Sequence, residues 1–155
     1  MALVIAGAGP IIALANIQQL QLLKDLFAEV TIPNAVWLET QAKDKQDSRI
    51  IYEARESDWL HVVNVDIIQH FPRSLHDGEN EALQLACNEQ DTLLILDDQL
   101  ARREASRLGL QFIGTVKVLS LAQQKGLIGD AKVCIEAMQS VGYRVSAKFL
   151  NIKPT

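Results

Sequence analysis

The chain has 155 residues, of which 48% are hydrophobic and 22% are charged, and its net charge is −4. This length fits one domain and this composition can bury a core, which excludes a disordered chain and predicts a single domain over residues 1–155. The net negative charge excludes a protein held to nucleic acid by bulk electrostatics, because neutralising phosphates requires clustered Lys and Arg. Any such contact must be local.

The N-terminus and the cysteines indicate the compartment. The first apolar run lacks a basic segment before it and is interrupted by glycines, a proline and an asparagine, so we expect neither a signal peptide nor a membrane span. Cys87 and Cys134 show no metal-ligand spacing. We therefore interpret them as buried free thiols in a reducing cytoplasm.

Short apolar runs alternate with helical patterns along the whole chain. In chain order, the predicted elements are a strand at 2–6, a helix at 10–28 with a break near residue 16, a strand at 30–32, helices at 34–41 and 48–55, a strand at 60–65, a helix opening at residue 77, a strand at 93–96, a helix at 99–108, a strand at 110–113, and helices at 116–125 and 130–140. Asp77 is the predicted N-cap of its helix, and Gly109 is a predicted helix stop. This alternation predicts an α/β fold with a central parallel sheet and helices on both faces, a three-layer sandwich.

Carboxylates follow the predicted strands where a parallel sheet forms its sites. Sites in open parallel sheets lie at the carboxyl ends of the strands, and Gly7 and Asp97 stand at two such ends. Acids that converge there repel one another unless a cation neutralises them, and Mg²⁺ or Mn²⁺ is the hard ion that oxygen ligands favour. The candidate metal ligands are Glu39, Glu79, Glu81, Asp97 and Asp98.

Each of these acids also has a structural explanation. Glu79 and Glu81 lie in the first turn of a helix, where negative charge favours the helix dipole, and their spacing lets at most one point squarely into a site. Asp98 is suited to cap the next helix, and Glu39 alone resembles an ordinary surface acid. Asp97 is harder to explain structurally, because a carboxylate directly after four buried apolar residues needs a partner.

Three further features have alternative readings. Arg102, Arg103 and Arg107 form a basic face that could steer phosphates, although a solvated helix face is the simpler interpretation. Thr115 either binds a carboxylate or caps the next helix, and we favour the cap. The string at residues 7–10 resembles a dinucleotide-binding loop, but the third glycine is absent and a proline removes an N–H group, so we discount that cofactor.

Several blocks in order resemble a bacterial and archaeal branch of the PIN-domain family. The blocks are LVIAGAGPIIAL at 3–14, IPNAVWLE at 32–39, GENEALQLA at 78–86, LILDDQLAR at 94–102 and GT at 114–115. Each block alone is weak, but together they cover about residues 3–125 and their joint specificity is high.

The resemblance implies a Rossmann-like α/β/α sandwich and a site of three or four acids that bind Mg²⁺ or Mn²⁺ for phosphodiester hydrolysis of RNA. Its second acid would be Glu39, its third Glu81 or Glu79, and its fourth Asp97 with Asp98 beside it. The first acid should stand at position 7, where this chain has Gly7, and Thr115 would support the site. Many relatives are VapC-type toxins, which implies an antitoxin partner and a homodimer.

Two hypotheses follow. The first is a metal-dependent ribonuclease that uses Glu39, Glu81 and Asp97, with Arg102 and Arg103 contacting RNA. The second is a catalytically inactive PIN fold that binds RNA or protein. Gly7 is open to three explanations: a degenerate nuclease, an inactivating substitution placed in this chain, or a site that survives on the remaining acids. The segment at 142–150 either completes the core or packs on another subunit, and we favour the core.

Overall fold

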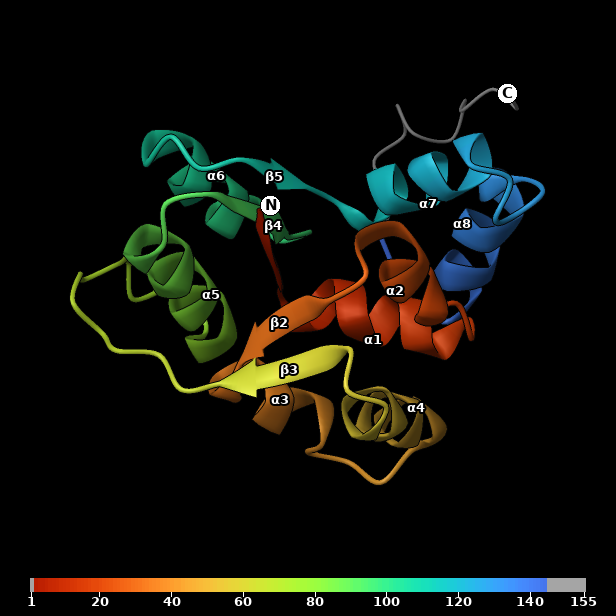
Figure 1. The fold of residues 1–155 in the computed structure, drawn as a ribbon, viewed down its shortest axis with the longest axis horizontal. Coiled ribbons are helices and arrows are strands. Elements are labelled where there is room, and N and C mark those ends of the chain that lie inside the picture. The colour runs from red at the N-terminus through yellow and green to blue at the C-terminus, as the bar shows by residue number, and fades with distance from the viewer. Residues whose placement is uncertain (1, 145–155) are drawn as a thin grey trace.

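A computed structural model describes residues 2–144 as five strands and eight helices (Figure 1). In chain order the elements are β1 (Leu3–Ala6), α1 (Ala8–Asn16), α2 (Gln21–Phe27), β2 (Val30–Pro33), α3 (Asn34–Thr40), α4 (Gln46–Glu56), β3 (Leu60–Val63), α5 (Asp77–Asn88), β4 (Thr92–Ile95), α6 (Gln99–Arg107), β5 (Phe112–Ile113), α7 (Thr115–Gln124) and α8 (Ala131–Ser140).

The five strands form one parallel sheet in the order β3-β2-β1-β4-β5. β1 is therefore the central strand, and Ala6 at its end pairs with Ile95 at the end of β4. The loops after β1, β2 and β4 leave the same edge of the sheet. This topology brings Gly7, Asp97 and the start of α3 to neighbouring positions, as the sequence predicts.

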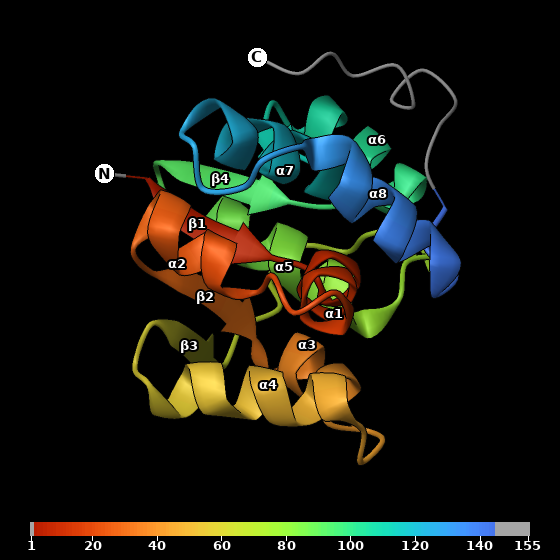
Figure 2. The ribbon, with the colours of Figure 1, turned by 90° about the vertical axis from the view of Figure 1, so that its right-hand side faces the viewer.

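Helices cover both faces of the sheet and bury two separate apolar clusters. Val4 and Ala6 of β1 join the cluster formed with α1, α2, α4, α7 and α8, whereas Ile5 joins the cluster under α5 and α6. Figure 2 looks onto the first of these faces, with α5 and α6 behind the sheet. Successive strand residues point to opposite faces, and burying each large apolar side chain contributes roughly 1.5–3 kcal/mol. The predicted three-layer α/β/α sandwich is confirmed.

Element boundaries differ from the predictions by a few residues. The break near residue 16 is confirmed, because Gln18 has a positive φ of 59° between α1 and α2, and Gly109 ends α6 with a φ of 72°. The prediction for Asp77 is wrong: the N-cap of α5 is His76, and Asp77 lies in the first turn, where its charge still favours the helix dipole. β3 and β5 are shorter than predicted.

Both cysteines are free thiols, as predicted, although each is only half-buried. Burial raises the pKa of the Cys87 and Cys134 thiols, which keeps both protonated and weakly nucleophilic at neutral pH. None of the helices within residues 2–144 has the length and apolar character needed to cross a bilayer. The predicted role of residues 145–150 lies outside the described residues.

Candidate active site at the carboxyl ends of the strands

Gly7 ends the central strand in a conformation open to any residue. Its φ of −81° and ψ of 169° are extended, and its N–H donates to the Ile95 carbonyl at 3.0 Å. A Cβ atom built at Gly7 would lie 3.4 Å from Leu96 Cδ2 and 3.7 Å from the Ile95 oxygen, which is ordinary van der Waals contact. Neither backbone strain nor lack of space therefore requires glycine here, and a carboxylate side chain can start from this position.

Asp97 follows β4 and is held by several donors. Oδ1 accepts from the Thr115 backbone N–H at 2.9 Å, and Oδ2 accepts from the Thr115 hydroxyl at 2.5 Å. The prediction that Thr115 caps α7 is wrong, because Gly114 is the N-cap and makes no side-chain bond. The Asp97 carboxylate instead binds the first N–H of α7 from the neighbouring strand, so the alternative reading of Thr115 is the observed one.

Tyr143 is a further partner of Asp97. Burial, followed by the charge of Asp97 and a hydrogen bond to it, raises the pKa of the Tyr143 phenol well above its usual range. The phenol therefore stays protonated and acts as a donor to the carboxylate. No spacing in the sequence indicates this contact, because Tyr143 follows α8 and reaches Asp97 only through the packing of α8 on α7 and α1.

Asp98 and the arginines of α6 have separate roles. Asp98 Oδ2 accepts from the Ala101 N–H at 2.9 Å, which confirms that Asp98 caps α6. Arg102 turns back to the strand end, where Nε donates to the Leu96 carbonyl at 2.8 Å and Nη2 lies 3.8 Å from Asp97 Oδ1. Arg103 is exposed. The predicted basic face is therefore divided: Arg102 points inward, whereas Arg103 is exposed and Arg107 is paired with Glu104 at 2.8 Å.

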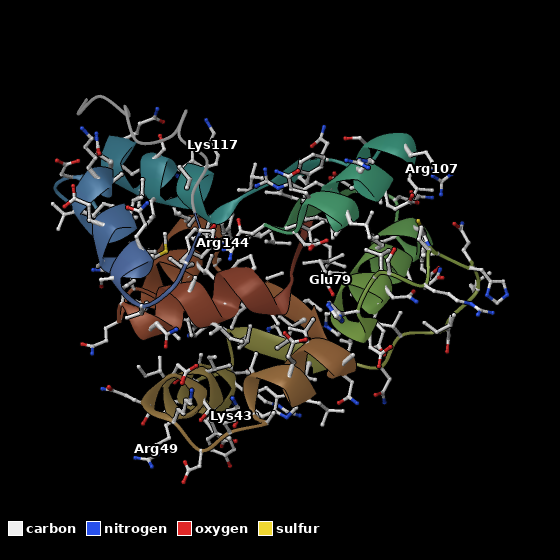
Figure 3. The ribbon with its side chains drawn as sticks, turned by 180° about the vertical axis from the view of Figure 1, so that it is seen from behind. Lys43, Arg49, Glu79, Arg107, Lys117 and Arg144 are labelled. Atoms are coloured by element: carbon white, nitrogen blue, oxygen red, sulfur yellow. The ribbon has the colours of Figure 1, made fainter. Side chains whose placement is uncertain are left out.

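The glutamates come together from α3 and α5. Partial burial, and then the charge of Glu79, raises the pKa of Glu39, while His76 lowers it. In Figure 3, Glu79 extends from α5 toward the middle of the molecule. Glu81 Oε1 instead accepts from the Ala35 N–H at 3.1 Å in the first turn of α3. Glu79 is therefore the partner of Glu39, and Glu81 is engaged in holding α3 against α5.

Comparison with known families decides the identity of the fold. A family model described as DUF3368, PIN domain, matches residues 3–152. The chain belongs to this PIN-domain family. No curated protein and no solved structure gave a match. The resemblance of the sequence blocks to PIN domains is thus confirmed at the level of the family.

PIN domains generally depend on a divalent metal, so the fit of this site to such an ion can be tested on its acids. Within residues 2–144, His, Cys, Asp and Glu side chains form no group of three that could hold a metal ion. Asp97 faces Arg102 and three donors, while Glu81 and Asp98 each bind a backbone N–H group. The acids as they stand do not fit a divalent centre. The position that would join the two sides of the site is occupied by Gly7.

A separate surface hollow lies away from the strand ends. It is formed by the end of α3, the following loop and α4, and its lining includes Lys43, Arg49 and Tyr52. Arg49 Nε donates to Asp44 at 3.2 Å, so its charge is already paired. Figure 3 shows Lys43 and Arg49 on α4 and the adjacent loop, on a different part of the surface from Glu79.

Proposed function

We propose that this PIN-domain protein binds RNA through a ribonuclease site whose hydrolytic activity is silenced at position 7. The observation that supports this most strongly is the place of Gly7 at the end of the central strand, between the strand that leads to Asp97 and the strand that leads to α3 and Glu39. A carboxylate there would extend the Glu39–Glu79 pair toward Asp97. With glycine at position 7, the Glu39–Glu79 pair and Asp97 remain separate from each other.

The separation of these groups accounts for loss of hydrolysis. Metal-assisted cleavage of a phosphodiester needs several carboxylates that converge on one point, and no such group exists among the described residues. Loss of a single well-placed electrostatic contact lowers a catalytic rate by roughly 10²–10³. A natural chain with this site should therefore bind its substrate and release it uncut.

Local positive charge supports RNA as the ligand. Arg103, Lys117 and Arg144 are exposed, and Figure 3 shows Lys117 on α7 and Arg144 just after α8. Such side chains contact phosphates without reading bases, which agrees with a protein whose net charge is −4. The PIN-domain family is the reason to prefer RNA over other polyanions.

On the resemblance to VapC-type toxins alone, we extend the proposal to an antitoxin protein as partner, to a homodimer and to a cytoplasmic site of action. These partners bear on regulation and do not alter the chemistry proposed for position 7. Co-purification with the neighbouring gene product and light scattering of the purified chain would test them.

The first test of the proposal measures binding and cleavage of a mixed RNA panel with and without Mn²⁺. We expect the natural chain to bind RNA without cutting it and the Gly7→Asp variant to gain Mn²⁺-dependent cleavage. Gly7→Asn is the matched control, because asparagine has the same size and caps α1 equally well but lacks the charge. Adding Asp97→Asn to Gly7→Asp should abolish the gain and exclude a contaminating nuclease.

Two results would contradict the proposal. Cleavage by the natural chain that is lost with Asp97→Asn would mean that Glu39, Glu81 and Asp97 suffice for an active ribonuclease. Failure of every variant to bind RNA would instead favour a protein-interaction module.

A further inference from the structure

The side chain of Arg102 is held in a defined position beside Asp97. Its Nε donates to the Leu96 carbonyl at 2.8 Å, and its guanidinium lies 5.6 Å from the centre of the Phe112 ring, on the ring face. Nη2 is 3.8 Å from Asp97 Oδ1, and the two side chains are only 30% and 20% exposed. Three groups from three residues thus hold the guanidinium: the Leu96 carbonyl, the Phe112 ring and the Asp97 carboxylate.

The absence of a side chain at Gly114 leaves the space that the Arg102 guanidinium occupies. A Cβ atom at Gly114 would lie 1.8 Å from Arg102 Nη2, which is impossible unless the guanidinium moves. The φ of −105° and ψ of 177° at Gly114 suit any residue, so the backbone does not explain the glycine. The glycine is instead explained by the space that the Arg102 side chain needs. The G-T block and the D-D-x-x-A-R block of the sequence therefore meet in one cluster.

The Asp97 carboxylate is already satisfied by this cluster. It receives both Thr115 donors and a bond from Tyr143, and the Arg102 guanidinium lies beside it. A second cation at the same carboxylate would be repelled by the guanidinium and would have to displace it from a half-buried position. Removing the arginine would leave a carboxylate with no compensating charge.

We propose that the guanidinium of Arg102 takes the place of a bound cation at Asp97 and keeps divalent ions from that carboxylate while position 7 carries no acid; with Gly7→Asp, a second carboxylate would let a divalent ion compete with the guanidinium. Arg102 is thus a positioning residue that holds Asp97 at the strand end without a metal. Its guanidinium is already engaged and is not available to bind RNA phosphates. This replaces the prediction that Arg102 contacts RNA, and it leaves that role to the exposed Arg103.

This inference concerns the same site as the proposed function, but its test requires no RNA. The probe is Mn²⁺ alone, followed by its electron paramagnetic resonance signal on titration and by the thermal midpoint of the protein. If Mn²⁺ binding responds to Arg102 while no variant binds RNA, the proposed function fails and the inference stands.

Arg102→Gln removes the charge and keeps a polar side chain, and Arg102→Lys is the matched control that keeps the charge. We expect Arg102→Gln to bind Mn²⁺ at least about tenfold more tightly than the natural chain, since a like charge within about 4 Å changes the cation affinity of a carboxylate by that order. Arg102→Lys keeps the charge but loses the Nε bond to Leu96, so it should gain clearly less Mn²⁺ affinity than Arg102→Gln. Adding Asp97→Asn to Arg102→Gln should remove the gain.

Gly114→Ala gives an independent test, because it keeps the arginine but places a methyl group in the space that the guanidinium occupies. The alanine Cβ would also lie 3.0 Å from Asp97 Oδ1, so the carboxylate must shift slightly as the guanidinium leaves. We expect this variant to gain Mn²⁺ affinity as well, and it decides the question if Arg102→Gln does not fold. Unchanged Mn²⁺ affinity in the folded variants, or a gain that survives Asp97→Asn, would overturn the inference.

Discussion

The two acidic sides of the site are built in opposite ways. Asp97 is surrounded by a cation and by donors from α7 and from the residue Tyr143, so its charge is compensated within the chain. Glu39 faces another carboxylate, Glu79. Partial burial and that neighbouring charge raise the pKa of Glu39, although His76 lowers it in part. The Asp97 side therefore stabilises the fold, whereas the Glu39 side carries a net electrostatic penalty.

Under the proposed function, this difference explains how the fold could keep the site without its hydrolytic activity. The Asp97 side connects β4, α6 and α7, so selection for stability alone would preserve it. The Glu39–Glu79 side carries an electrostatic penalty that a purely structural pair would not need. Gly7 lies between them, and variants on the two sides should therefore have opposite effects on stability.

The largest effect is expected from Asp97→Asn. It removes the charge opposite Arg102 and disturbs the bonds from Thr115 and Tyr143, so we expect a loss of about 3 kcal/mol in the free energy of unfolding. Urea denaturation at pH 7 measures it. The double variant Asp97→Asn with Arg102→Gln should recover part of the loss, and a fully additive pair would show that the two side chains do not interact.

Thr115→Val should have the next largest effect. Valine keeps the shape of threonine at this fully buried position but removes the hydroxyl that donates to Asp97 Oδ2. We expect a loss of about 1–2 kcal/mol, because the hydrogen bond to a charged acceptor is lost. Thr115→Ser, which keeps the hydroxyl, is the control. Equal melting of the valine variant and the natural chain would mean that the hydroxyl adds nothing to the stability of the Asp97 side.

The fold was predictable because its signals are local. The run at 93–96 is apolar and short and is followed by an acid, so a buried strand with a candidate site at its end follows from period and position. The N-cap role of Asp98 is also a short-range property, because donor and acceptor lie within one turn.

The contacts of the candidate site were less predictable because they join distant residues. Nothing in the sequence near Thr115 indicates whether its hydroxyl meets its own helix or Asp97, and Tyr143 is brought to the site only by helix packing. Arg102 and Arg103 are adjacent, yet one turns to the strand end and the other to solvent. Helical period alone does not separate them, since a long side chain can fold back along the helix.

Glu81→Ala is expected to have a moderate effect. Glu81 Oε1 accepts from the Ala35 N–H in the first turn of α3, which amounts to a helix cap supplied by α5. Loss of a cap typically costs about 1 kcal/mol, so thermal unfolding should shift by a few degrees. Glu79→Ala is the matched control on the same turn and should not destabilise the protein. If Glu79→Ala is the more harmful change, the assignment of Glu81 as the cap is wrong.

The smallest effect, with the opposite sign, is expected from Glu39→Gln. The pKa of Glu39 is raised above its ordinary value of 4.5, so the folded chain holds this proton more tightly than the unfolded chain does. The linkage relation then makes stability fall as pH rises from 4.5 through the folded pKa, and the penalty remains at pH 7. Glu39→Gln should remove this pH dependence and stabilise the protein by a few tenths of a kcal/mol at most. The effect is small because Glu39 is only partly covered by its neighbours and water screens most of its charge.

Denaturation curves between pH 4.5 and 7 measure the change, and Glu79→Gln should lower the pKa of Glu39 in an NMR titration. A Glu39 variant that is less stable at pH 7 than the natural chain would show that this side, like the Asp97 side, is a stabilising contact.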